Sequence, residues 1–202
     1  MNIIGILAYG SLIDDPGQEI QAVIAKRVEG VETPFKVEFA RKSRRRDYAP
    51  TLVPVEEGGA YVKSVILVLK EHVSEAEAIC MLWRRETNQV GSQRTYKPSA
   101  NPGPNTVIID RLENFQGIGV VFYTKISANI DNPTPKKLAE LAIQSARAKA
   151  GAEGRDGISY LISAKRNGIM TPLMSEYEKE ILRRTGTQSL EEALKFLRAD
   201  SD

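Results

Sequence analysis

The chain has very little cysteine or histidine, and this scarcity excludes several kinds of site. Its single cysteine, Cys80, cannot form an internal disulfide or a zinc site with several thiolate ligands. Cys80 falls inside a helical pattern, which is typical of a small buried apolar residue. The single histidine, His72, precedes a helix start and has no second histidine to share a metal ion with. The sequence therefore predicts no metal site.

The glycine motifs that hold nucleotides are also absent. The chain contains neither a G-x-G-x-x-G nor a G-x-x-x-x-G-K-[ST] stretch, so nucleotide-driven chemistry has no support. It also lacks a G-x-S-x-G elbow, the turn that presents a serine nucleophile. What remains for catalysis is carboxylates and main-chain amides, which suffice for acyl transfer when the substrate supplies its own nucleophile.

Long apolar runs and an excess of one charge are missing as well. The chain has 28 basic and 26 acidic residues, a formal net charge of +2. So small a net charge does not favour nucleic acid as a partner. No apolar run approaches membrane-spanning length, and residues 1–8 lack the basic start and cleavage site of a signal peptide. We therefore expect a cytoplasmic protein without a nucleic-acid or membrane partner. The sequence does not specify the oligomeric state.

The first two thirds of the sequence reads mainly as strands. Residues 3–8 form an unbroken apolar run, typical of a central strand, and it stops at Tyr9-Gly10-Ser11, as a strand does where it enters a ligand loop. Residues 18–27 fit a short helix and a strand equally well. Residues 36–40 alternate as a half-buried strand, with Val37 and Phe39 inward. Further strands are expected at 51–55, 62–69, 106–110 and 117–126.

Helical patterns occur once among these strands and then throughout the last third. Ser74 and Glu77 form a capping box that begins a helix over 74–89, and a polar loop follows over 91–105. Helix starts at Thr134-Pro135, Asp156, Thr171-Pro172 and Ser189 divide the rest. This order predicts an α+β fold in one domain, 1–202, with a core over about 1–130 and a helical C-terminal part over about 131–202. Leu190, Leu194 and Leu197 lie on one side of the last helix, against the core or a second subunit.

One carboxylate falls on the apolar face of the 74–89 helix. Ile79, Leu82 and Trp83 form an apolar stripe at helical spacing, and Glu86 continues that stripe while Arg84 and Arg85 point elsewhere. Burial of an unpaired carboxylate costs several kcal/mol unless its pKa rises. Two interpretations stay open: a structural glutamate paired with an arginine of a neighbouring strand, or a carboxyl with a raised pKa that transfers protons near neutral pH.

Two stretches together carry a resemblance to a known family. Tyr9-Gly10-Ser11-Leu12 resembles the YGSL loop of the γ-glutamylcyclotransferase superfamily, which includes the ChaC-like glutathione-degrading enzymes. LWRRETNQVGSQRTY resembles the helix and loop that carry that family's catalytic glutamate, which would be Glu86. VEFARKS…APTLVPV and GAEGRDGISYL are similar to further family segments, in the same order along the chain.

The resemblance implies a fold and a reaction. The fold would be a mixed, barrel-like β-sheet with flanking helices and a helical C-terminal third. In the reaction, the α-amine of a γ-glutamyl compound attacks its own γ-carbonyl and releases 5-oxoproline and a free amine. Glu86 would be the general acid and base, and the backbone at Gly10, Ser11 and Leu12 would hold the substrate and the oxyanion. The resemblance implies a transferase or lyase of glutathione metabolism that needs no cofactor.

Other candidate residues have two interpretations each. Tyr9 is expected either to bind substrate or to end the strand, and Tyr96 either to line the pocket or to anchor its loop. Ser43 and the arginines after it are expected to bind a substrate carboxylate or to form a solvated basic edge. The sequence departs from the glutathione-specific branch: Ile13-Asp14 replace an aromatic residue, and RKSRRRDYAP replaces a His-Arg-Gly motif. These departures weaken the assignment of glutathione itself as the substrate.

A binding protein on the same fold is the alternative function. The basic stretch at residues 41–46, RKSRRR, with Tyr48 nearby, would then contact an acidic partner. No aromatic interleaving accompanies this stretch, and phosphate binding would make the affinity fall steeply with salt.

Overall fold

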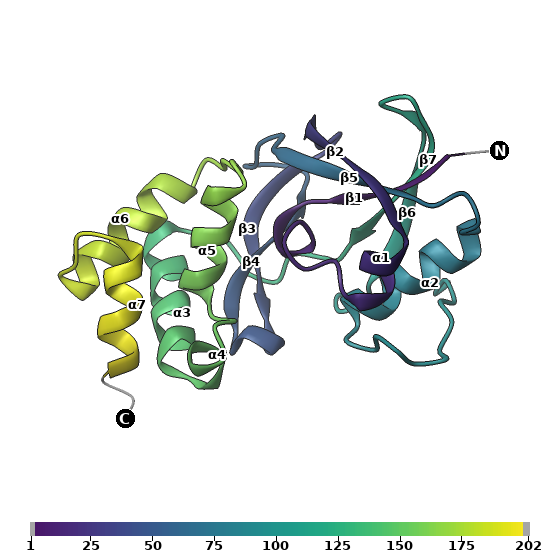
Figure 1. Ribbon diagram of the computed structural model, residues 1–202. Coiled ribbons are helices and arrows are strands. Elements are labelled where there is room, and N and C mark those ends of the chain that lie inside the picture. The colour runs from purple at the N-terminus through teal and green to yellow at the C-terminus, as the bar shows by residue number, and fades with distance from the viewer. Residues whose placement is uncertain (1–2, 200–202) are drawn as a thin grey trace. The chain divides into compact units, whose positions relative to one another are not determined.

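The computed structural model describes residues 3–199, which group into two compact units (Figure 1). The first unit holds the chain up to Thr33 and the segment Lys63–Ser127, and the second holds Pro34–Val62 and the chain from Ala128 onward. This grouping differs from the expected division near residue 130, because the segment 34–62 groups with the C-terminal helices. That the chain forms a single domain stays a prediction.

A five-stranded mixed sheet organises the first unit. Its order is β2-β5-β1-β7-β6, where the strands are β1 (Ile4–Ala8), β2 (Ile24–Glu32), β5 (Lys63–Leu69), β6 (Ile108–Phe115) and β7 (Ile118–Lys125). β1 pairs antiparallel with β5 and parallel with β7, and every one of its residues is buried. The unbroken apolar run therefore marks the middle strand of the sheet, as expected. Gly5 fits there because a Cβ would lie 2.6 Å from Ile66 Cγ2.

The sheet is open rather than barrel-like. β2 and β6 are its two edges, and the strand pairings of residues 3–199 do not close it into a barrel. The expected α+β class and the mixed sheet are confirmed, whereas the closed curvature is not found. Charged side chains are frequent on both edge strands, as is usual for strands with an unpaired side.

The segment that fits both a helix and a strand contains both. Residues 18–27 start as α1 (Gln18–Val23) and continue without a break into β2. The hairpin of β6 and β7 differs from the expectation in a similar way, because residues 112–115 extend β6 and only Gln116-Gly117 make the turn. Both turn residues have positive φ, of 52° and 74°, as a two-residue hairpin with a type I′ turn requires.

Helix α2 (Glu75–Glu86) begins where the capping box predicts. The Ser74 hydroxyl accepts from the N–H of Glu77, and the Glu77 carboxylate accepts from the N–H of Ser74. The helix ends at Glu86, three residues earlier than expected, so this glutamate lies in the last turn. α2 packs on α1, β1, β6 and β7 of its own unit.

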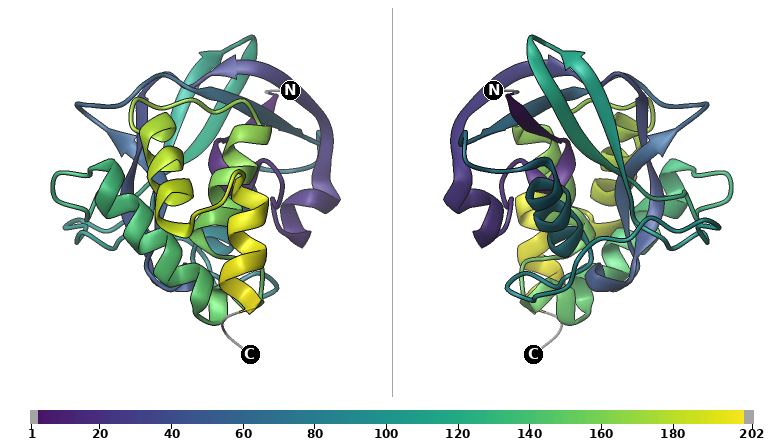
Figure 2. Two further views of the ribbon diagram at one scale, coloured as in Figure 1. Left: turned by 90° about the vertical axis from the view of Figure 1, so that its left-hand side faces the viewer. Right: turned by 90° about the vertical axis from the view of Figure 1, so that its right-hand side faces the viewer.

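The second unit combines a two-stranded sheet with the C-terminal helices (Figure 2). β3 (Lys36–Ser43) pairs antiparallel with β4 (Ala49–Val55), and the 3₁₀ turn η2 (Arg44–Arg46) joins them. The helices are α3 (Pro135–Arg147), α4 (Lys149–Ala152), α5 (Gly157–Arg166), α6 (Met174–Thr185) and α7 (Leu190–Ala199). A Cβ on Gly157 would lie 2.9 Å from Ala142, so glycine permits the close approach of α5 to α3.

The helix starts follow local signals. Thr134 caps α3, which has Pro135 at its first position, and Asp156 caps α5 through two main-chain N–H groups. α6 begins slightly after Thr171-Pro172 and ends at Thr185, just before Gly186, whose φ is 67°. On α7, Leu190 and Leu197 are buried against helices of the same unit.

The half-buried strand at residues 36–40 is buried on both faces. Val37 and Phe39 are inward as predicted, but Glu38 is only 2% exposed and Ala40 is buried too. The Glu38 carboxylate accepts hydrogen bonds from the Thr171 hydroxyl at 2.6 Å and from the N–H of Leu173 at 3.1 Å, just before α6. A polar residue can point inward here because its carboxylate accepts from a main-chain N–H at the start of a helix, which has no acceptor within the helix.

No helix within residues 3–199 is long and apolar enough to cross a bilayer.

Candidate functional site

The loop after β1 is a tight turn that begins at a glycine. Gly10 has a φ of 76°, a left-handed conformation that favours glycine, and Gly10–Leu12 form the 3₁₀ turn η1. Leu12 is buried beneath the loop. The Tyr9 hydroxyl donates to the carbonyl of Thr124 in β7 at 2.6 Å. Tyr9 therefore ties the end of the central strand to its neighbour, which supports the strand-ending interpretation.

Glu86 is less buried than its position in the sequence predicts. Its side chain is 26% exposed, and the buried face of α2 consists of Ala78, Met81 and Leu82. Arg85 continues that face at helical spacing and is only 11% exposed. The prediction that Glu86 lies on the packed face of the helix is wrong, because α2 is turned so that Arg85, rather than Glu86, points toward the packed side.

Arg85 joins Glu86 to the loop after β1. Its Nη1 donates to Glu86 Oε1 at 3.1 Å, and its Nη2 lies 3.3 Å from the Ser11 hydroxyl. Nε and Nη2 both donate to the main-chain carbonyl of Asp15, at 3.0 and 2.6 Å. The two motifs of the predicted site, 75 residues apart along the chain, thus meet on one guanidinium. The glutamate does have an arginine partner, but from the adjacent position rather than from a strand.

A second arginine on α2 anchors the loop that follows the helix. Arg84 donates from Nε and Nη2 to the carboxylate of Glu19 in α1, and from Nη1 to the carbonyl of Arg94. Glu19 also accepts from the N–H of Gly91. Burial raises the pKa of Glu19, but the hydrogen bonds from Arg84 and Gly91 outweigh it and hold the pKa below its usual value.

Tyr96 anchors the same loop further along. Its hydroxyl accepts from the N–H of Ile109 at 3.2 Å, and its ring lies 6.3 Å from that of Trp83. These contacts support the loop-anchoring interpretation of Tyr96.

A hollow of about 470 Å³ lies beside this loop. It is bounded by the outer face of α2 and the start of the loop, and its lining is Glu19, Ala76, Glu77, Cys80, Arg84, Gly91, Ser92, Gln93 and Thr95. None of the site residues predicted from the sequence lines this hollow. It is therefore separate from the Ser11–Arg85–Glu86 contact.

Ser43 and the basic stretch belong to the second unit, whereas the other candidates belong to the first. Ser43 ends β3, and its carbonyl accepts from the N–H of Tyr48. Arg46 lies over the Tyr160 ring at 4.6 Å and donates to the carbonyl of Arg155, so it packs within its unit. Arg44 and Arg45 are exposed, as a solvated basic edge would be.

The sequence interpretation missed Arg85 and Asp15. The available signal was the spacing of α2: positions 78, 81, 82 and 85 form a helical stripe as good as 79, 82, 83 and 86. Asp15 contributes a main-chain carbonyl, which sequence patterns do not reveal.

Comparison with models of protein families finds no match to this chain, and comparison with curated proteins finds none either.

Proposed function

We propose that this protein is a γ-glutamylcyclotransferase-type enzyme with the fold of that superfamily, acting in the cytoplasm on a small γ-glutamyl compound. The observation that supports this proposal best is the Ser11–Arg85–Glu86 contact. It joins the two stretches, YGSL and RRE, on which the resemblance depends most.

The reaction is an intramolecular acyl transfer. The α-amine nitrogen of the substrate attacks its γ-carbonyl carbon and closes a five-membered ring. The bond from that carbon to the leaving nitrogen then breaks, releasing 5-oxoproline and a free amine. The attacking amine is neutral: Glu86 takes one proton from its nitrogen as the ring closes and returns that proton to the leaving nitrogen. The ring keeps one amide N–H, the free amine leaves neutral and the carboxylate is regenerated.

The partial exposure of Glu86 suits this role. A side chain that is 26% exposed can reach a substrate, and the Arg85 hydrogen bond occupies only one of its two carboxylate oxygens. A carboxylate oxygen has further lone pairs, so Glu86 retains capacity to accept a proton.

The loop at Gly10–Leu12 would bind the γ-carbonyl. Its main-chain N–H groups would receive the negative charge that develops on the carbonyl oxygen. Tyr9 would shape the site through the backbone that it anchors. Because the nucleophile and the carbonyl belong to one molecule, the reaction needs no organic cofactor.

The test is release of 5-oxoproline from a panel of γ-glutamyl compounds: glutathione, γ-glutamyl amino acids and γ-glutamylamines. We expect activity in the wild type and a loss of about 10² to 10⁴ in kcat for Glu86→Gln, which keeps the size but cannot transfer the proton. Glu75→Gln is the matched control. Glu75 lies on the same helix but pairs at the surface with Arg111, so its removal should leave the rate unchanged.

Wild-type protein that is silent on every compound would overturn the proposal. The alternative, a binding protein that uses the basic stretch at residues 41–46, would then be tested by the salt dependence of its binding to an acidic polymer.

A further inference from the structure

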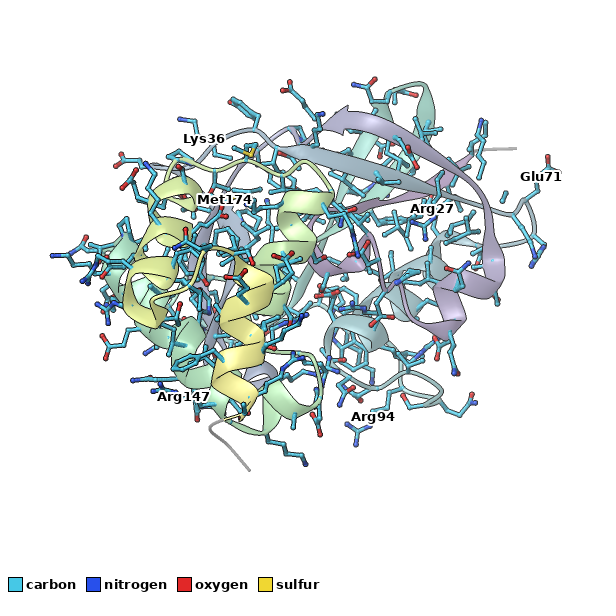
Figure 3. All side chains as sticks on the ribbon, turned by 60° about the vertical axis from the view of Figure 1, so that its left-hand side comes forward. Arg27, Lys36, Glu71, Arg94, Arg147 and Met174 are labelled. Atoms are coloured by element: carbon cyan, nitrogen blue, oxygen red, sulfur yellow. The ribbon has the colours of Figure 1, made fainter. Side chains whose placement is uncertain are left out.

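The segment that follows β1 wraps around two arginine side chains. Arg27 of β2, labelled in Figure 3, donates from Nη1 to the carbonyl of Ile13 at 2.8 Å. Arg85 of α2 donates twice to the carbonyl of Asp15. Two main-chain carbonyls of one loop are thus held by charged donors from different elements, and such bonds are stronger than those between neutral groups.

Only one of these arginines also contacts the proposed catalytic carboxylate. A guanidinium has five N–H donors in a rigid plane. In Arg85, Nε–H and Nη2 bond to Asp15, Nη2 also approaches the Ser11 hydroxyl, and Nη1 bonds to Glu86. The main-chain contact therefore fixes the plane in which the other two contacts lie.

The loop is built to admit this side chain. Gly17 has a φ of 79°, and a Cβ there would lie 3.0 Å from Arg85 Cγ. Its N–H donates to the Asp15 side chain at 3.1 Å, which closes the turn around the arginine. A glycine is thus required at this point both by the backbone conformation and by the space that Arg85 occupies.

We propose that Arg85 is the positioning residue of the site: it holds the carboxylate of Glu86 and the Ser11 loop in one fixed geometry. This inference rests on the proposed function. Arg85 is not itself a receptor for a substrate carboxylate, since four of its donor contacts are made within the protein and its side chain is 11% exposed. Its contribution to the rate comes from alignment, and a misplacement of about 1 Å can cost about 100-fold.

The experiment compares Arg85→Gln and Arg85→Lys with Arg84→Gln. Arg84 is the matched control, because it lies on the same helix, is similarly buried and is bonded to a carboxylate, but it has no contact with Glu86 or Ser11. We expect Arg85→Gln to lower kcat for 5-oxoproline release about 100-fold, with KM changed less than about fivefold. Arg85→Lys should recover part of the lost kcat. The lysine ammonium can make one of the hydrogen bonds of the arginine, but it cannot make all the contacts of the planar guanidinium at once. Arg84→Gln should keep kcat within about threefold.

A double variant separates positioning from a general effect on folding. If Arg85 acts through Glu86, then Arg85→Gln added to Glu86→Gln should lower the remaining rate less than about threefold, because residues that act as a unit are not additive. A full further 100-fold loss would overturn the proposal. So would an Arg85→Gln enzyme with wild-type kcat.

The outcomes also distinguish this proposal from the proposed function. Wild-type protein that releases no 5-oxoproline from any compound of the panel overturns both. An active wild type, a strong loss in Glu86→Gln and an unaffected Arg85→Gln overturns only the role of Arg85.

Discussion

Tyr177 in α6 offers a sharp test of the packing in the second unit. Its side chain is fully buried with its ring 5.4 Å from that of Phe39, and among residues 3–199 its hydroxyl is the buried side-chain polar atom that has no hydrogen-bond partner. A buried hydroxyl without a partner costs about 1–3 kcal/mol of desolvation. Phenylalanine at this position removes that cost and keeps the ring.

The expected gain follows from two opposing contributions. Removal of the hydroxyl leaves a void of roughly 10 Å³, which at about 24 cal/mol per Å³ costs about 0.2 kcal/mol. The desolvation cost is larger, so Tyr177→Phe should raise the free energy of unfolding by about 1–3 kcal/mol. Urea unfolding followed by circular dichroism measures this change, and the slope of the transition should stay the same.

Alkaline pH should enlarge the difference between Tyr177→Phe and the wild type. Burial, and then the negative charge of Asp156, raise the pKa of Tyr177 above its ordinary value of 10.0. Because its pKa is raised in the folded protein, Tyr177 contributes stability that is fully present below pH 10. This contribution is lost as the pH rises above 10, because the tyrosine then ionises in the unfolded chain and stays neutral in the folded one. The free energy of unfolding of the wild type should therefore fall by about 1.4 kcal/mol per pH unit above 10. The variant has no hydroxyl at this position, so this fall should be absent from it.

The control for this prediction is Tyr9→Phe. The Tyr9 hydroxyl has a partner, the Thr124 carbonyl, so its removal should lower the free energy of unfolding by about 0.5–1.5 kcal/mol. A Tyr177→Phe protein that is also less stable than wild type by 1 kcal/mol or more would show that the hydroxyl has a partner, and would refute the reasoning.

Two further predictions concern the first unit. Gly17→Ala should lower the free energy of unfolding by about 1–2 kcal/mol, because alanine is strained at a φ of 79°, and should also lower kcat, because its Cβ crowds Arg85. Wild-type kcat in this variant would contradict the packing described for Arg85. Ser74→Ala should cost about 1 kcal/mol of stability by removing the cap of α2, measured by thermal unfolding. Its kcat should be unchanged, since the cap and Glu86 lie at opposite ends of the helix.

The proposed site shows how far sequence patterns reach. The loop at Tyr9–Leu12 and the helix that carries Glu86 were predicted with nearly correct bounds, because both depend on residues close together in the chain. The exposure of Glu86 was predicted wrongly. Two stripes on α2 fit helical spacing, and only the elements packed against the helix decide which of them is buried.

The sequence by itself determined the features that arise within a few residues. The capping box at Ser74, the caps at Thr134 and Asp156, and the central strand at Ile4–Ala8 are local consequences of hydrogen bonding and hydrophobic period.

Tertiary structure decided the contacts between distant segments. It left the five-stranded sheet open and buried Glu38 against the start of α6. It also brought Ser11, Asp15 and Glu86 onto the guanidinium of Arg85. The physical reason is that a charged side chain is buried only where donors and acceptors from other elements satisfy it, and those partners are fixed when the chain folds.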